Sequence, residues 1–260
     1  MTRKDLPRLE AALVEDAPGN FTESELHGLP APVASYLGAA VAVGTPLALT
    51  ARIHMRGRIK IGRWVPFRAF EILSPHVGFV WAARAAGIVS GSDRFVHGDG
   101  GMDWKLAGLF PVMRSAGPDI SRSAAERAAA EAVWIPTALL PRFGVAWSTT
   151  GDRQISARYQ IADYPVQIDY SLTDDGRIRS VRFDRWGDPD STGTFAVHPF
   201  GGEFTAHATF DGVTIPSEGR LGWHHGTDRW GEGEFFRYRI TNLELVTGRH
   251  TPGVEHGEPN

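Results

Sequence analysis

Cysteine is absent from the 260 residues, which excludes disulfides, thiolate metal sites, iron–sulfur clusters and cysteine nucleophiles. Lysine is scarce, because only Lys4, Lys60 and Lys105 occur, and Schiff-base chemistry therefore has few possible carriers. The chain also lacks a Gly-x-Gly-x-x-Gly fingerprint, a Walker loop and a Gly-x-Ser-x-Gly elbow. These absences disfavour kinases, Rossmann dehydrogenases and α/β-hydrolases.

No excess of one charge and no long apolar run is present. The 27 basic and 30 acidic residues give a formal charge of −3, so we expect no nucleic-acid partner. Asp5 and Glu10 stand where a signal peptide would need an apolar stretch. The weakly polar run 38–49 is broken by Gly44 and Pro46 and is too short to cross a bilayer. We therefore expect a cytoplasmic protein without stable membrane insertion.

What the chain does contain is alternation of apolar and polar residues. From Leu47 to Ile61 the odd positions are mainly apolar and the even positions mainly polar, which predicts a strand. Asp174-Asp175-Gly176 and Asp211-Gly212 are typical of hairpin turns. So many sequential hairpins predict an antiparallel sheet that curls into a barrel or half-barrel, since a flat sheet leaves long unpaired edges. Further strands are predicted at 64–73, 77–84, 93–97, 102–106, 154–161, 165–172, 177–186, 203–210, 213–216 and 234–246.

Helical spacing is found before the strands and once between them. Residues 3–16 and 31–43 carry apolar residues at helical intervals. A central helix is predicted over 123–134, because Ser123 and Glu126 form a capping box and Pro136 stops the run of alanines.

These elements predict an α+β fold: one strongly curved antiparallel β-sheet, a half-barrel or barrel-like, with N-terminal helices and a central helix covering its concave face. A single domain is expected, with three parts. They are an N-terminal helical segment packed on the sheet (1–46), the sheet with its inserted helix (47–247) and a disordered tail (248–260).

Several motifs along the chain carry a resemblance. They are Leu29-Pro30-x-Pro32-Val33-x-x-Tyr36-Leu37, Gly78-Phe79-x-Trp81, Asp93-Arg94-Phe95-Val96-x-Gly98, Arg122-Ser123-Ala124, Glu131-Ala132-x-Trp134-x-Pro136-Thr137, Arg185-Trp186 and Glu234-Phe235-Phe236-Arg237. Together they resemble an uncharacterised bacterial domain family that is common in actinobacteria. That resemblance implies a shared fold over roughly residues 29–246 and supplies no chemistry. In architecture alone, the predicted sheet also resembles the LolA/LppX half-barrels that hold lipid or acyl chains.

The central helix carries a first candidate for catalysis. Glu131 and Trp134 are three residues apart and face the same way, with Arg127 one turn earlier. If that face looks into the hollow of the sheet, Glu131 is a partly buried carboxylate suited to general acid or base chemistry. The other interpretation is a structural Arg127–Glu131 surface pair with Trp134 in the core.

A second candidate is the loop from His97 to Trp104, which brings together a base, two carboxylates and three glycines. His97 would titrate near neutrality with Asp103 orienting it, or the loop is simply a hairpin turn. His97-x-Asp99 also matches two ligands of a non-haem iron triad, with His198 or His207 as the third. No metal and no cofactor is predicted.

Aromatic and basic residues supply candidate ligand-binding positions, with core packing and ion pairing as the alternatives. The candidates for substrate binding are Trp81, Trp104, Arg122, Trp134, Arg185, Trp186 and Arg237. A separate basic face, from Arg52 and His54 to Arg56, Arg58 and Lys60, is either a solvated strand face or a site for an anionic group.

The leading hypothesis from the sequence is a cofactor-independent enzyme (an isomerase, cyclase, lyase or hydrolase) acting on a mainly apolar small molecule between sheet and helix. Glu131, Asp103 or His97 would transfer protons and arginine would stabilise negative charge. The alternative is a non-catalytic carrier or sensor of lipid or acyl-chain ligands. A third possibility is a non-haem iron oxygenase. The sequence specifies neither the substrate nor the oligomeric state.

Overall fold

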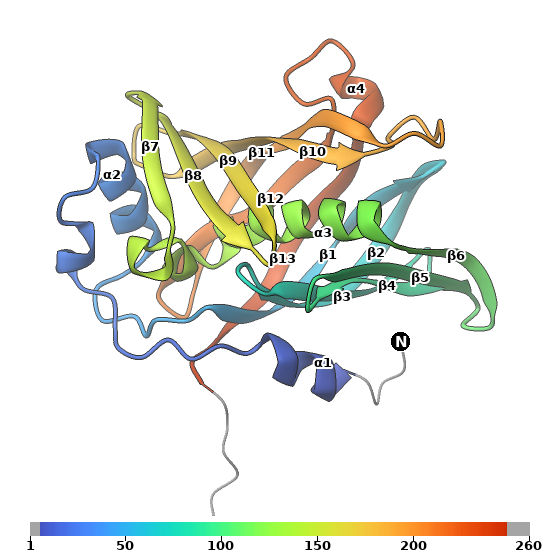
Figure 1. Cartoon of the computed structure of the whole chain (residues 1–260), viewed down its shortest axis with the longest axis horizontal. Coiled ribbons are helices and arrows are strands. Elements are labelled where there is room, and N and C mark those ends of the chain that lie inside the picture. The colour runs from blue at the N-terminus through green and yellow to red at the C-terminus, as the bar shows by residue number, and fades with distance from the viewer. Residues whose placement is uncertain (1–5, 249–260) are drawn as a thin grey trace, which may run out of the picture.

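The computed structural model describes residues 6–248, and thirteen antiparallel strands in this range form one curved sheet (Figure 1). The strand order is β6-β5-β4-β3-β2-β1-β13-β12-β11-β10-β9-β8-β7. The two edge strands do not pair with each other, so the sheet is a half-barrel. The strands are β1 Thr50–Ile61, β2 Arg63–Ser74, β3 Gly78–Ala85, β4 Val89–Val96, β5 Asp99–Leu106, β6 Phe110–Ala116, β7 Ala146–Gly151, β8 Gln154–Ile161, β9 Tyr164–Leu172, β10 Ile178–Gly187, β11 Ala196–Phe210, β12 Val213–Trp223 and β13 Glu234–Val246.

The structure confirms the predicted α+β half-barrel. The sequence features that predicted it, alternating residues and hairpin turns, also explain its strands locally. In β1 the odd residues Ile53 and Met55 are buried, while the even residues His54 and Arg56 are exposed. Asp211 and Gly212 both have positive φ, which is the backbone of a two-residue hairpin turn. The sequence missed the two edge strands, β6 and β7, because each pairs on one side only and buries few side chains.

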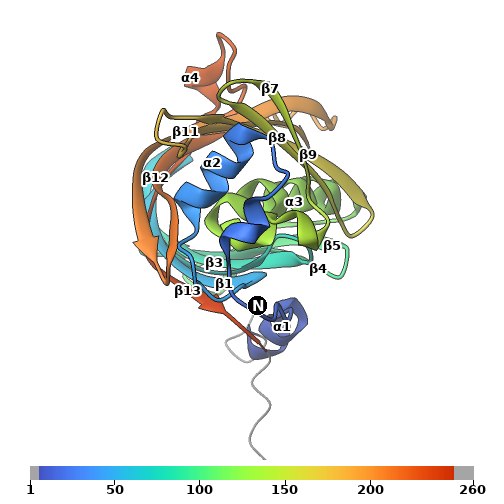
Figure 2. The same ribbon diagram turned by 90° about the vertical axis from the view of Figure 1, so that its left-hand side faces the viewer.

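Helix α3 lies inside the curl of the sheet (Figure 2) and contacts both of its halves, β5 on one side and β9 and β10 on the other. Its alanines allow this close packing, since Ala125, Ala128 and Ala129 are completely buried. Gly100 on β5 marks the closest approach, because a Cβ there would lie 2.5 Å from Ser121 Cα. The helices are α1 Leu6–Leu13, η1 Glu23–Leu26, α2 Ala31–Ala40, α3 Pro118–Ala130, η2 Glu131–Trp134, η3 Pro136–Leu139, η4 Pro141–Phe143 and α4 Trp230–Gly233.

The central helix begins five residues before its predicted start. Pro118 occupies the first turn after Gly117, which has a φ of 119°, and proline is well suited to that position because its missing N–H needs no partner there. Ser123 lies inside the helix, so the predicted capping box is wrong. The hydroxyl of Ser121, one of the first residues of the helix, instead accepts a hydrogen bond from Gly100 N at 2.8 Å. The predicted end at 134 holds, but the last four residues form the 3-10 turn η2.

The N-terminal helices do not share one face of the sheet. Helix α2 closes one end of the curl, against β12, β7 and β8. Helix α1 packs on the convex side, where Leu13 joins Ile72, Val80 and Val96 in a small cluster separate from the main core. The expectation that both cover the concave face is therefore corrected for α1. The predicted disordered tail, 248–260, lies outside the described residues apart from Gly248.

Candidate functional site

The concave side of the half-barrel holds a buried polar cluster centred on Arg127 of α3. The Arg127 guanidinium donates to Glu131 Oε1 at 2.8 Å and to Asp93 Oδ2 at 3.0 Å, and its third nitrogen lies 3.6 Å from Glu71 Oε1. Trp104 Nε1 completes the cluster by donating to Asp93 Oδ1 at 2.8 Å. The guanidinium also stacks on the ring of Phe79. One arginine thus joins strands β2 and β4 to the end of the helix.

Three carboxyl groups surround this one guanidinium, and the resulting excess of negative charge affects the pKa values of these carboxyl groups. Glu71 is 0% exposed, and burial, reinforced by the neighbouring Glu131, raises its pKa well above the ordinary range despite Arg127. Burial likewise raises the pKa of Asp93, against the opposing effect of Arg127. Of the three carboxyls, Glu71 is therefore the one whose neutral form burial favours most, because ionising it would place a further uncompensated charge in the core.

A second buried cation, Arg185 on β10, lies close enough to influence this cluster. Burial and the positive charge of Arg127 lower its pKa to about 10. Its guanidinium stacks on Phe200 at 4.6 Å and on Trp223 at 5.0 Å from the ring centroids. At neutral pH it remains charged and balances part of the negative charge of the cluster.

Aromatic rings form a continuous wall beside the polar cluster. Trp104 contacts Trp81 at 5.7 Å between ring centroids, and Trp81 contacts Phe67 at 5.9 Å. Phe67 stacks on Phe236 at 4.9 Å, and Phe236 stacks on Tyr238. Four strands that are far apart in the sequence, β5, β3, β2 and β13, are thereby joined on one face. The wall ends where Trp134 of η2 donates to the Tyr238 hydroxyl at 3.3 Å.

Two polar atoms in this interior have no hydrogen-bond partner, Nε1 of Trp81 and Nε of Arg185. The carboxyl groups of Glu71 and Glu131, by contrast, hydrogen-bond to each other. Buried polar atoms are normally paired, so two unpaired ones beside the cluster indicate a site that accommodates a polar group from outside the chain.

The predicted site residues divide into those that the structure brings together and those that it separates. Glu131, Trp81, Trp104, Trp134 and Arg185 all lie in or beside the buried cluster. The predicted Arg127–Glu131 pair exists, but it is buried instead of lying on the surface.

Arg122 and Trp186 lie together elsewhere along α3. The Arg122 guanidinium is 4.3 Å from the Trp186 ring centroid, and Trp186 Nε1 donates to Asp119 at 2.8 Å. Glu126 links this group to the helix by pairing with Arg122 and by accepting from Trp186 N. These contacts fasten α3 to β10.

Three other predicted site residues face away from the cluster. His97 is exposed and occupies the β4–β5 turn with a positive φ of 54°. Of the two interpretations of this loop, the hairpin turn therefore describes it. Asp103 lines a surface hollow of about 590 Å³ on the convex side. Arg237 is also on that side, where it pairs with Glu234 and covers Trp64.

The sequence analysis missed the acids that matter most, Glu71 and Asp93. Glu71 stands in the apolar run Ala69-Phe70-Glu71-Ile72-Leu73 at a position that alternation directs inward. That signal was available, because an acid at an inward position of a strand requires a buried partner. Asp93 carries no comparable signal, since its neighbours in β4 are small and polar.

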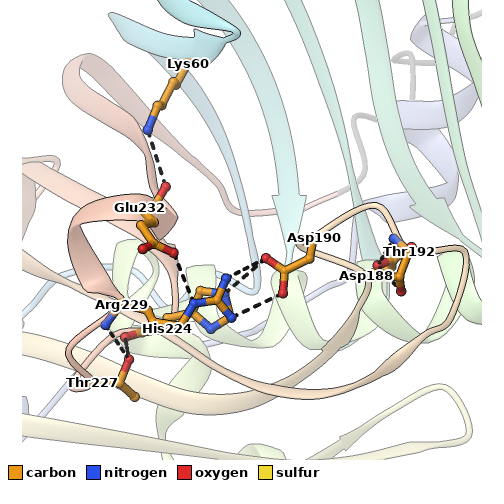
Figure 3. Close-up of polar contacts among 8 residues, drawn as sticks. All are labelled: Lys60, Asp188, Asp190, Thr192, His224, Thr227, Arg229 and Glu232. Carbon is orange, nitrogen blue, oxygen red and sulfur yellow. Dashed lines mark hydrogen bonds and ion pairs between the residues drawn. The ribbon is translucent and has the colours of Figure 1, made fainter.

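The rim of the half-barrel is fastened by a second, exposed polar network (Figure 3). Arg229 donates to both carboxylate oxygens of Asp190, at 2.7 and 3.2 Å, and to Glu232 at 3.1 Å. Lys60 Nζ reaches the Glu232 carbonyl at 3.3 Å. These contacts hold the loop after β10 and the segment around α4 to the tip of β1.

No group of three or more histidine, aspartate or glutamate side chains among residues 6–248 is placed to hold a metal ion. The iron triad suggested by His97 and Asp99 therefore does not assemble. None of the helices in the same range is long and apolar enough to span a bilayer.

The chain belongs to DUF6544, a family of unknown function whose model matches residues 19–235. No curated protein matches it. Among solved structures, it is similar to a LolA superfamily protein from Nitrosomonas europaea, with 8% identity and a TM-score of 0.42, covering 83% of this chain and 92% of that one. It is also similar to a domain assigned to outer-membrane lipoprotein sorting from Vibrio parahaemolyticus, with 10% identity and a TM-score of 0.39, covering 78% and 87%.

The leading prediction from the sequence, a cofactor-independent acid/base enzyme, is wrong. Glu131, its main catalytic candidate, is paired with Arg127 in the buried cluster. The alternative prediction, a non-catalytic carrier or sensor of lipid or acyl-chain ligands, needs no carboxyl group that is free to transfer a proton.

Proposed function

We propose that this protein is a non-catalytic carrier or sensor that binds a mainly apolar molecule bearing one polar group, such as a fatty acid or another lipid. The observation that carries the proposal is the buried polar cluster around Glu71, with the unpaired Nε1 of Trp81 beside it, enclosed by an aromatic wall. A polar head group placed there would satisfy atoms that are otherwise costly to bury.

The surroundings suit an acyl chain extending from that head group. Beyond the aromatic wall, the inward positions of β1, β2 and β4 continue with Ile59, Val65 and Val89, which are only partly buried. An apolar path therefore runs along the concave face from the polar cluster to the ends of these strands. Phe236 is also partly buried and lies along this path.

The charge state of the cluster favours a ligand that is an acid or an alcohol. A protonated Glu71 donates one hydrogen bond and accepts another, and Arg127 is already committed to Glu131 and Asp93. A single uncharged group, such as a hydroxyl or a protonated carboxyl, is therefore matched to the site, whereas an anionic group would add to an existing excess of carboxylates.

Tryptophan fluorescence with dibrominated stearic acid tests this proposal, since bromine quenches tryptophan only at close contact. We expect saturable quenching in the wild type, with a smaller quenched fraction in Trp81→Phe and Trp104→Phe. Trp64→Phe is the matched control, because that ring lies on the convex side under Arg237. Absence of saturable quenching, or a loss only in the Trp64 variant, would contradict the proposal. The cytoplasmic location stays a prediction.

A further inference from the structure

Strands β1 to β4 present an unusually basic surface for a chain with a net negative charge. Residues 50–96 contain eight lysine and arginine residues but only two acids, Glu71 and Asp93. Both acids point into the concave side, where they contact Arg127. The convex face of these four strands is consequently left with basic residues and no acid of its own.

The arginines of this face are aligned across neighbouring strands. Arg239 of β13 lies opposite Arg56 of β1, Arg56 lies opposite Arg68 of β2, and Arg68 lies opposite Arg84 of β3. Adjacent strands are about 4.8 Å apart, so these four side chains form one continuous row, which we call the arginine row. Arg58 lies beside it, opposite Arg237. The row borders an open hollow of about 820 Å³ on the convex surface.

Most of the arginine row has no ion-pair partner among residues 6–248. Arg239 pairs with Glu218 at 2.9 Å, but Arg56, Arg68 and Arg84 make no ion pair or hydrogen bond with any residue in the described range. Like charges directly opposite each other destabilise a sheet. Three adjacent uncompensated arginines therefore lower the stability of the fold unless an anionic partner from outside covers them.

Exposed apolar side chains gather beside the arginine row. Hairpins β1–β2, β3–β4 and β5–β6 all turn at the same end of the sheet, because the strands alternate in direction. Seven of the nine large hydrophobic side chains exposed among the described residues lie on these hairpins, and Leu109 reaches 76% exposure. The seven are Ile61, Ile88, Leu106, Leu109, Phe110, Val112 and Met113. We call them the apolar tips.

The two features together distinguish between possible anionic partners. A free phosphate or a nucleic acid would use the arginines but would leave the apolar tips in water. The surface of a bilayer offers both environments, since phosphate groups lie just outside a region that accepts apolar side chains. Peripheral binding of this kind needs no membrane-spanning helix.

We propose that the arginine row and the apolar tips form a docking surface for a bilayer that contains anionic phospholipids. The row contacts the head groups and the tips enter the interface. Lys60 takes no part in the row because it is bound to the Glu232 carbonyl at the rim. The inward apolar path described above opens at the same end of the sheet, so docking would bring that path next to the lipid. The docking itself does not depend on the proposed carrier function.

Vesicle flotation tests the docking surface. Wild-type protein should bind phosphatidylcholine vesicles containing about one third phosphatidylglycerol, bind pure phosphatidylcholine vesicles far less, and dissociate as salt is added. Replacing Arg56, Arg68 or Arg84 singly by glutamine should weaken binding about fivefold each, because one basic group near an anionic leaflet contributes about that factor. Arg179→Gln, an exposed arginine on β10, is the matched control and should bind like the wild type.

The apolar tips have their own variant and control. Leu109→Ser combined with Phe110→Ser should weaken vesicle binding about tenfold or more, since two apolar side chains no longer enter the interface. Val43→Ser changes an equally exposed residue far from the hairpins, at 64% exposure, and should have no effect. Circular dichroism of each variant establishes that it is folded.

Three outcomes would overturn the proposal. Equal binding to neutral and anionic vesicles, or binding unaffected by the arginine and tip variants, would show that this surface is not used. Competition by soluble glycerol phosphate at concentrations that do not screen charge would indicate a site for a free anion. Tighter binding to a DNA oligonucleotide that depends on the arginines but not on the tips would indicate a nucleic-acid surface. Quenching by brominated stearate is also measured in the arginine variants. Lost vesicle binding with retained quenching would mean that docking fails while the proposed lipid binding persists.

Discussion

Arg127 and Arg68 lie on opposite sides of the same curved sheet and differ in what surrounds them. Arg127 is enclosed on the concave side with Glu131, Asp93 and Glu71 around it, whereas Arg68 stands exposed in a row of like charges. Burial makes an unpaired charge costly, and on the concave side acids from two strands and from the end of a helix accordingly lie around Arg127. Water removes that requirement on the convex side. The position of the acids therefore separates arginines that hold the fold together from arginines available to a partner.

The largest effect we expect is from Arg127→Ala. Removing the guanidinium leaves two ionised carboxylates buried without their cation, which costs about 3–5 kcal/mol of unfolding free energy. Urea denaturation measures it, with Arg56→Ala as the convex-side control, expected to change stability by no more than about 0.5 kcal/mol. Equal losses of unfolding free energy in the two variants would show that arginines on the two faces do not differ in their contribution to stability.

A pair of adjacent glycines compares the two sides at the level of packing. Gly100→Ala places a methyl group 2.5 Å from Ser121 Cα in α3, where backbone must shift, and should cost about 1–3 kcal/mol. Gly101→Ala points to the convex side and meets only the movable end of Arg94 at 3.4 Å. It should cost less than about 0.5 kcal/mol. Thermal melts of both variants decide whether α3 is packed as closely as described.

The two sides should also differ in how stability depends on pH. Because burial raises the pKa of Glu71 in the folded state, its contribution is fully present below the pKa of the unfolded chain. It is lost as the pH rises from there through the raised folded pKa. Glu71→Gln should therefore flatten the decline in stability as the pH rises above the ordinary carboxyl range.

Asp188, in an exposed loop, provides the opposite case. Hydrogen bonds from Thr192 and Gly193 lower its pKa, so its contribution is lost as the pH falls, and Asp188→Asn should flatten the acid side instead. Denaturant midpoints measured across the pH range for both variants test the two signs together. A Glu71→Gln profile that still declines as steeply as the wild type would show that another group carries the proton.

The sequence was sufficient for the elements whose side chains alternate clearly, and for the basic face itself. The alternation from Leu47 to Ile61 located β1 and identified Arg56 and Arg58 as one face. It could not show that Arg68 and Arg84 extend this face, because strand register depends on long-range pairing. The same reason hid Asp93, which meets Arg127 only because the sheet curls around α3. The edge strands were missed because half-paired strands need little apolar patterning.

We expect the smallest change in unfolding free energy from a substitution in the arginine row, and this change has the opposite sign to that of Arg127→Ala. Arg68→Gln relieves repulsion from Arg56 and Arg84 on either side, so stability should rise by about 0.2–1 kcal/mol at low salt. The gain should shrink at higher salt, where exposed charges are screened over about 10 Å. Arg179→Gln, outside the row, should give no gain. If Arg68→Gln gains stability while losing affinity for anionic vesicles, the repulsion within the row is a cost of function, because a surface selected for stability alone would have placed acids among these arginines.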